Sequence, residues 1–134
     1  MHYLLDTNIC IYLIKKRPPE AQEHFRAHSP TDVALSIITV FELEFGAQKS
    51  QHPQQTRQAL NKFLAPLSIL NLDRPSVTES AGIRAQLEKE GKPIGAYDLL
   101  IAGMARSMGL VLVTNTTREF ERVPGLQLEN WVAS

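Results

Sequence analysis

Short apolar runs alternate along the chain with longer segments in which apolar residues recur every three or four positions. The short runs are typical of buried strands, and the longer segments are typical of helices that bury one face. The pattern predicts strands at about 2–6, 33–36, 67–72, 110–113 and, more weakly, 126–129. It predicts helices at about 9–16, 19–27, 39–49, 53–64, 75–91 and 97–108.

Local residue choices indicate where these helices begin and end. Asp6, Thr7 and Asn8 are all capable N-caps for the first helix, so a cap at Thr7 or Asn8 would leave Asp6 free. Gly109 is the expected C-cap of the helix before it. Two further helices carry the spacing of a capping box, at Thr39-x-x-Glu42 and Ser76-x-x-Glu79.

The order of the elements is strand, helices, strand, helices, strand, helices, strand, strand. Such alternation predicts an α/β fold with a mainly parallel central sheet flanked by helices on both faces. Ligands of open sheets of this kind bind beyond the carboxyl ends of the strands. No internal repeat, low-complexity stretch or linker interrupts the pattern, so one domain is expected over residues 1–134.

Composition and charge narrow the class of protein. The 14 basic and 14 acidic residues give a formal net charge of zero, which argues against a protein that coats nucleic acid by charge alone. Net charge hides distribution, so an acidic centre framed by local basic residues stays possible. Cys10 is the single cysteine, which excludes an internal disulfide and a cysteine-rich zinc site. No secretion signal or membrane-spanning run is visible, so a cytoplasmic location is expected.

Four acidic residues, far apart in sequence, fall near the ends of expected elements: Asp6, Glu42, Asp98 and Glu119. Each has an ordinary alternative role. Asp6 could be an N-cap, and Glu42 could belong to the capping box. Asp98 could interact favourably with the dipole of its helix, and Glu119 could lie on a solvated face. As a set they predict an acidic pocket at the sheet edge. Thr114 and Asn115, at the end of the late apolar strand, are expected to orient a carboxylate or a metal-bound water.

Carboxylates gathered at one edge would repel one another unless a divalent cation held them. Oxygen ligands suit Mg²⁺ or Mn²⁺ rather than zinc, and we expect Asp6 and Asp98 to hold the metal. Such a centre serves phosphoryl chemistry with a metal-activated water and needs no side-chain nucleophile. The basic residues that could frame the pocket are Lys15, Lys16, Arg17, Arg84, Lys89, Lys92, Arg118 and Arg122.

Six segments of the chain, taken in order, form a pattern that spans nearly its whole length. They are Leu4-Leu5-Asp6-Thr7-Asn8, Ser36-x-x-Thr39-x-x-Glu42-Leu43-x-x-Gly46, Pro93-Ile94-Gly95-x-x-Asp98-x-x-Ile101-Ala102, Val113-Thr114-Asn115, Arg118-Glu119-Phe120 and Asn130-Trp131. In their order and spacing these segments resemble the PIN-domain ribonucleases, and specifically the VapC-type toxins of bacterial toxin–antitoxin pairs.

The resemblance implies a Mg²⁺- or Mn²⁺-dependent endoribonuclease with Asp6, Glu42 and Asp98 as its first acidic positions. Such toxins arrest translation, often by cutting tRNA or rRNA. The resemblance also implies a homodimer, and a VapB-type antitoxin whose C-terminal tail blocks the acidic cleft, in a toxin–antitoxin assembly. Many members carry an Asp at the position of Thr116, so Glu119 is the expected fourth acid here.

Other classes fit less well. A phosphoryl-accepting receiver or phosphatase would want a second acid beside Asp6 or a lysine at a later strand end, and neither is present. No G-x-x-x-x-G-K-[ST] or G-x-G-x-x-G segment supports a nucleotide-binding enzyme. Two alternatives stay open: a catalytically weak PIN-fold protein-binding module, and a DNA- or RNA-processing nuclease outside toxin–antitoxin biology.

Overall fold

A parallel sheet forms the centre of the molecule. The computed structural model describes residues 1–132. Within this range the five strands are β1 (Tyr3–Leu5), β2 (Val33–Ser36), β3 (Ser68–Leu70), β4 (Val111–Val113) and β5 (Leu128–Glu129). Their order is β3-β2-β1-β4-β5, and every pairing is parallel. The predicted α/β class with a parallel central sheet is therefore confirmed.

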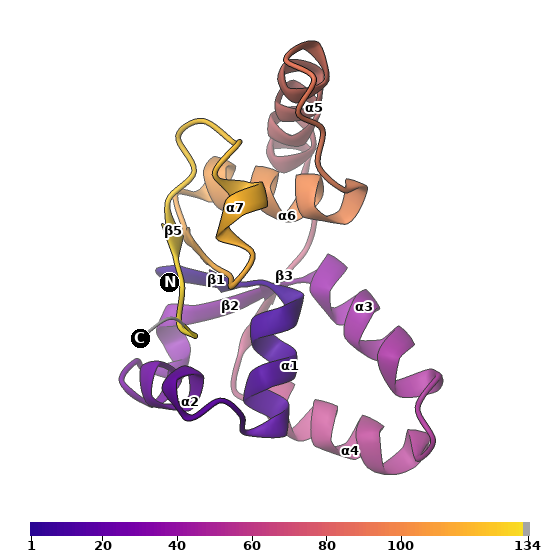
Figure 1. The fold of residues 1–134 in the computed structure, drawn as a ribbon. Helices are drawn as coiled ribbons and strands as arrows, with labels where there is room; N and C mark the ends of the chain where they lie inside the picture. Colours follow the sequence, from indigo (N-terminus) through magenta and orange to yellow (C-terminus); the bar gives the residue numbers. More distant parts are fainter. Residues whose placement is uncertain (133–134) are drawn as a thin grey trace.

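Helices cover both faces of this sheet (Figure 1). They are α1 (Thr7–Lys15), α2 (Pro19–Arg26), α3 (Ile37–Gln48), α4 (Pro53–Leu64), α5 (Arg74–Lys89), α6 (Ala96–Met108) and the short α7 (Thr117–Phe120), with a 3-10 turn η1 (Pro30–Asp32). In the view of Figure 1, α1, α2 and α4 lie below the sheet, and α5, α6 and α7 lie above it. Among residues 1–132, no helix combines the length and apolar character that crossing a membrane would require.

Alternation along the strands divides the core into two layers. Leu4 and Leu112 point to the layer that holds α5 and α6, whereas Leu5 and Val113 point to the layer that holds α1 and α2. Because successive strand residues face opposite sides, a sheet covered on both faces needs unbroken apolar runs. This requirement explains why the strands appear in the sequence as continuous apolar segments.

Helices α3 and α5 begin earlier than expected, because in each the N-cap is a residue that precedes the predicted capping box. Ser36, the last residue of β2, caps α3 by accepting a hydrogen bond from the Ile38 N–H at 3.0 Å. Asp73 caps α5 in the same way, from the Ser76 N–H at 3.0 Å. The predicted capping box of each helix is therefore wrong. The short helix α7 and the 3-10 turn η1 were not among the predicted elements, because both segments are too short to show a period.

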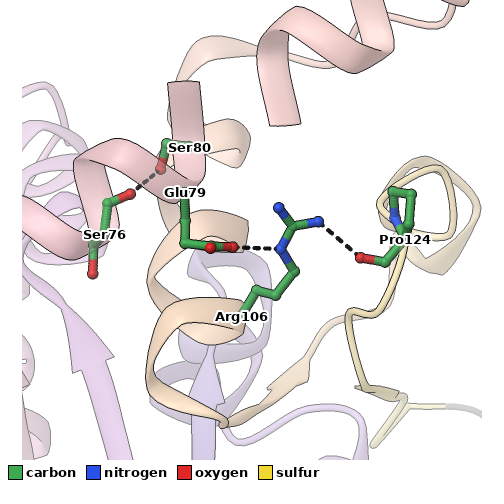
Figure 2. A network of polar contacts seen from close by, with 5 residues as sticks. All are labelled: Ser76, Glu79, Ser80, Arg106 and Pro124. Carbon is green, nitrogen blue, oxygen red and sulfur yellow. Dashed lines mark hydrogen bonds and ion pairs between the residues drawn. The ribbon is translucent and has the colours of Figure 1, made fainter. Parts of the chain in front are cut away.

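Helices α5 and α6 pack closely, and Figure 2 shows the polar contacts beside them. A Cβ added at Gly103 would lie 2.8 Å from the Ser80 backbone nitrogen, so the backbones approach each other at this point. Nearby, Arg106 Nε donates to Glu79 Oε2 at 2.6 Å, and Arg106 Nη1 donates to the Pro124 carbonyl at 2.9 Å. One arginine thus ties both helices to the loop before β5.

The end of the described chain is anchored by stacked rings. Trp131 is fully buried, and its Nε1 donates to Glu129 Oε1 at 2.8 Å. His24 and His28 both stack against its indole, with interplanar angles of 7° and 13°. Both histidines are half-buried against the indole, where they hold the chain that follows β5.

Candidate acidic active site

Asp6 is positioned by the end of β1 and the start of α1. Its backbone N–H donates to the Val113 carbonyl at 2.9 Å, which continues the pairing of β1 with β4. Its Oδ1 accepts a hydrogen bond from the Ile9 N–H at 2.9 Å, so Asp6 itself is the N-cap of α1. The expectation that Thr7 or Asn8 would replace it as the cap is wrong. Asp6 as a residue is only 4% exposed, yet it lines a surface pocket.

Glu42 reaches the same pocket from α3. Because Ser36 caps this helix, Glu42 lies in its second turn and takes no part in capping. Its Oε1 instead accepts a hydrogen bond of 2.6 Å from the Thr7 hydroxyl on α1. Glu42 is therefore not a capping residue of α3, and its carboxylate is directed at α1.

Asp98 and Glu119 form the other side of the pocket. Asp98 lies in the first turn of α6, as expected. Glu119 lies on α7, and its Oε1 accepts from the Gly95 N–H at 3.2 Å, immediately before α6. Glu119 lies close enough to Asp98 for its charge to raise the pKa of the Asp98 carboxyl. Glu119 therefore faces the pocket rather than the solvated surface that its charged neighbours suggested.

One pocket gathers all four predicted acids. The residues that line it are Asp6, Thr7, Asn8, Glu42, Asp98, Thr116 and Glu119. They come from α1, α3, α6 and α7 and from the segments after β1 and β4. Since β1 and β4 are neighbours while their following connections run to opposite sides, this is the crevice where parallel sheets bind ligands. None of the basic residues considered from the sequence is among the lining residues.

Of the two residues after β4 that were expected to orient a carboxylate or a metal-bound water, Thr114 and Asn115, only Thr114 contacts an acid of the pocket. Thr114 does hydrogen-bond the Asp6 carboxyl, and its hydroxyl lies 2.9 Å from that of Thr116. Asn115 is not among the residues that line the pocket, and its Nδ2 donates to the Tyr12 hydroxyl at 2.9 Å, which secures α1 to the strand end. The expected contact of Asn115 with a carboxylate is therefore not observed within residues 1–132. Thr116 also lines the pocket, at the position where the family resemblance implies an Asp in many members.

Crowding and burial perturb the acids. Burial raises the pKa of Asp6 to about 6, against hydrogen bonds from Thr114 and Ile9, and the Glu42 charge adds to the rise. Burial likewise raises the pKa of Asp98 to about 6, helped by the charges of Glu119, Asp6 and Glu42. Perturbed carboxyls in a cleft are a frequent feature of functional sites. The negative charges of the four acids therefore interact electrostatically across the pocket.

The donor chemistry of the pocket fits a hard divalent cation. Every side chain that lines it offers oxygen, as carboxylate, hydroxyl or amide, and neither sulfur nor imidazole is among them. Within residues 1–132, however, no three His, Cys, Asp or Glu side chains lie close enough to bind one ion directly. Mg²⁺ usually keeps several waters and takes only one or two carboxylates. A site with two direct carboxylates and intervening waters is consistent with this arrangement.

A parallel five-stranded sheet with acids at its central crevice defines the PIN class, and the PIN-domain family matches residues 3–126. The chain is 43% identical over 131 residues to the tRNA(fMet)-specific endonuclease VapC of Shigella flexneri, covering 98% of each protein. It is 46% identical over 132 residues to ribonuclease VapC2 of Haemophilus influenzae, covering 98% of this chain and 99% of the other. The toxin in the crystal structure of DNA-bound VapBC from Salmonella typhimurium superposes with a TM-score of 0.93 at 41% identity, over 98% of both chains.

The chain therefore belongs to the VapC ribonucleases, the PIN-domain endoribonuclease toxins of toxin–antitoxin systems. This confirms the resemblance, the fold and the activity that the sequence predicted. It also removes the receiver, phosphatase and nucleotide-binding classes from consideration.

Proposed function

We propose that this chain, acting as one domain over residues 1–134, hydrolyses RNA with Mg²⁺ or Mn²⁺ at the pocket of Asp6, Glu42, Asp98 and Glu119. The observation that carries the proposal is the convergence of four acids from separate elements on one pocket. Residues 133–134 lie outside the described part of the chain. We further propose tRNA as the substrate, in the cytoplasm where tRNA is found. Two VapC relatives more than 40% identical to the chain are named as tRNA(fMet)-specific endonucleases, which supports this choice.

Each acid has a distinct place in the proposal. Asp6 and Asp98, whose pKa values are raised by burial, would hold the cation. A bound Mg²⁺ or Mn²⁺ supplies a water of lowered pKa and offsets negative charge on the phosphate. Glu42, which reaches the same pocket from α3, would orient a water molecule and accept its proton. Thr114 keeps Asp6 directed at the pocket by hydrogen bonding to its carboxyl.

Glu119 is the proposed fourth acid, in place of the Asp that many family members carry where this chain has Thr116. Two observations support this assignment: Glu119 lines the pocket, and its charge raises the pKa of Asp98. The Thr116 hydroxyl lines the same pocket and could hold a water but carries no charge. The position of negative charge would thus move from the loop to α7.

An apolar groove beside the acids is the proposed seat of the antitoxin tail. The solved relatives include VapBC complexes, so a VapB-type partner is the expected one. The groove runs between α1, α3 and α4, and its lining includes Ile11, Ile14, Leu43 and Leu60. Glu42 lines both this groove and the acidic pocket. A peptide in the groove would therefore reach the acids at one end, which is where an inhibitor would need to act.

A second apolar surface supports the proposed homodimer. We define the α3 face as Ile37, Phe41 and Phe45, which follow one another at intervals of four residues on α3. Phe41 is 55% exposed, and it packs edge-to-face with the half-exposed Tyr97 of α6 at 5.7 Å. The opposite face of α3 is buried in the core through Leu43 and Ala47. Helices that are apolar all round are normally covered on both sides.

The decisive experiment measures cleavage of total bacterial RNA by the purified protein with Mg²⁺, Mn²⁺ or EDTA. The matched variants are Asp98→Asn, which removes a charge from the pocket, and Glu23→Gln, which removes one from the exposed side of α2. We expect discrete fragments that require metal, persist in Glu23→Gln and fall at least about a hundredfold in Asp98→Asn. Mapping the fragment ends would identify the RNA. Cleavage that survives in folded Asp98→Asn would exclude this centre, whereas a folded wild type that cuts no RNA in either metal would favour the weak binding module.

A further inference from the structure

The hydroxyl of Thr7 connects the two helices that face each other across the pocket. Thr7 is the first residue of α1, directly after Asp6. Its Oγ1 donates to Glu42 Oε1 on α3 at 2.6 Å and lies 3.2 Å from the Thr39 Oγ1 on the same helix. Thr39 is fully buried, whereas Thr7 and Glu42 are half-buried. The contact is therefore partly shielded from water.

The distances indicate where the single proton of Thr7 lies. A hydroxyl donates only one hydrogen bond, and 2.6 Å is the length expected when the acceptor is an ionised carboxylate. The longer contact to Thr39 is that of two neutral hydroxyls. The Thr7 proton is thus directed at Glu42, and the buried Thr39 limits the rotation of the Thr7 hydroxyl.

The hydrogen bond from Thr7 restricts the otherwise flexible side chain of Glu42. A glutamate side chain has several rotatable bonds, and it loses more conformational freedom on being fixed than most side chains do. Asp6 is held at once by the Ile9 N–H and by Thr114, but Thr7 gives the only side-chain hydrogen bond recorded for Glu42 within residues 1–132. One carboxylate oxygen is engaged with Thr7, so the other remains available to the pocket that Glu42 lines.

We propose that Thr7 is a positioning residue for Glu42, so that the first turn of α1 fixes two pocket acids, Asp6 directly and Glu42 through a hydroxyl. This inference rests on the proposed function, in which Glu42 acts at a metal-dependent centre. Partners of this kind commonly change metal affinity or activity by about 10–100-fold when removed. Thr7 also lines the pocket, but its one proton is directed at Glu42, so in this proposal it affects the reaction through Glu42.

The test measures Mn²⁺ binding by titration calorimetry, together with kcat and KM for RNA cleavage. Thr7→Val removes the hydroxyl at nearly constant shape, Thr7→Ser keeps it, and Thr78→Val removes an exposed hydroxyl from α5 as a matched control. Thr7→Val is also combined with Glu42→Ala, because the double variant has no carboxylate to position. Circular dichroism melts confirm that each variant folds.

We expect Thr7→Val to weaken Mn²⁺ binding about tenfold and to lower kcat with little change in KM, since a mispositioned Glu42 affects the reaction more than RNA binding. Thr7→Ser and Thr78→Val should stay within about twofold of wild type, and Thr7→Val should add nothing in the Glu42→Ala background.

Two results would overturn the inference while leaving the nuclease intact. Either Thr7→Val binds Mn²⁺ and cleaves as wild type does, or its effect is equally large in the Glu42→Ala background, which would mean that it acts on another group. If Thr7→Val does not fold, loss of Mn²⁺ affinity in folded Thr7→Ala, restored in Thr7→Ser, tests the same claim. A wild-type protein that neither binds Mn²⁺ nor cuts RNA would overturn the proposed function itself, and the role of Thr7 with it.

Discussion

Small polar neighbours decide how each acid of the pocket behaves. Asp6 is both an N-cap and a pocket residue, because one oxygen serves the Ile9 N–H while the carboxyl stays at the pocket wall. Asp98 lies in the first turn of α6, where the helix dipole favours an ionised carboxylate. Its pKa is nevertheless raised to about 6, so burial and the neighbouring acids outweigh the dipole.

This balance predicts that neutralising Asp98 stabilises the metal-free protein. The pKa of Asp98 in the folded protein, about 6, lies above the ordinary aspartate pKa of 3.8, so the folded state holds the proton more tightly than the unfolded state. The stability that Asp98 contributes is complete below about pH 4 and is lost as the pH rises through 6. In EDTA, Asp98→Asn should therefore raise the melting temperature by about 3–6 °C at pH 7.5, and by less at pH 5.

Thermal melts at the two pH values check this expectation, with Glu23→Gln as the control for removing an exposed charge. Added Mg²⁺ or Mn²⁺ should reverse the order of stability, because the wild type then gains binding energy that the variant lacks. A variant that melts below the wild type in EDTA at pH 7.5 would contradict the repulsion inferred for the pocket.

At the scale of elements, the placement of Asp98 depends on how closely α6 packs against α5. The small residues of α6 make this possible: Ala102 and Ala105 are fully buried in the core, and Gly103 faces Ser80. Since this side of α6 is packed in the core, the substrate must approach from the pocket side of Asp98.

The close approach predicts opposite effects for two glycines that look alike in the sequence. A Cβ at Gly103 would lie 1.9 Å from Ser80 Oγ and 2.9 Å from its Cα, whereas a Cβ at Gly82 of α5 would meet nothing within 4 Å. Gly103→Ala should lower the free energy of unfolding by about 1–3 kcal/mol, because backbone cannot yield as a flexible side chain does. Gly82→Ala should raise it by about 0.5–1 kcal/mol through helix propensity.

Urea unfolding of both variants measures the difference directly. The Arg106 contacts to Glu79 and Pro124 should remain in both variants, since neither substitution removes a partner. Equal stability of the two variants would mean that α5 and α6 separate without cost, and that the position of Asp98 is less constrained than the packing indicates.

At the scale of the whole molecule, two apolar surfaces border the acidic pocket on opposite sides of α3. The α3 face contains Phe41, next to Glu42 in sequence, and it touches Tyr97, next to Asp98. The groove on the other side shares Glu42 with the pocket. A second copy on the α3 face and an antitoxin in the groove could therefore bind together, each close to the acids. The formal net charge of zero does not oppose self-association.

The α3 face predicts a dimer that polar substitutions disrupt. Phe41 and Phe45 are 55% and 59% exposed, so replacing both by Ser should affect the monomer's own stability little. Aromatic anchors at interface centres are commonly worth about 2 kcal/mol or more each. We expect light scattering to give a dimer for the wild type and a monomer for Phe41→Ser/Phe45→Ser at the same concentration.

Val77→Thr changes an exposed apolar residue of α5 to a polar one of the same shape, and it should leave the dimer unchanged. A monomeric wild type, or a double variant that remains dimeric, would show that the α3 face is not the interface between copies.

Much of this architecture could be predicted because strong local patterns coincide with tertiary roles. Apolar runs identified all five strands within residues 1–132, and the Gly109 C-cap is confirmed by its left-handed φ of 67°. The starts of α3 and α5 could not be predicted as well. Ser36 and Asp73 compete as caps with residues three positions further on, and which one wins depends on the strand or loop that delivers the chain to the helix.

The sequence by itself determined the fold class and named four acids, because apolar periodicity and the residue types near element ends are local properties. Only the tertiary structure decided what those acids do with their neighbours. It directed Glu42 to Thr7, brought Glu119 from α7 against Asp98, and turned Asn115 towards Tyr12. The physical reason is that hydrogen bonding and repulsion between carboxyls depend on distances of a few ångströms across the crevice between β1 and β4. Those distances are set by how the helices pack on the sheet.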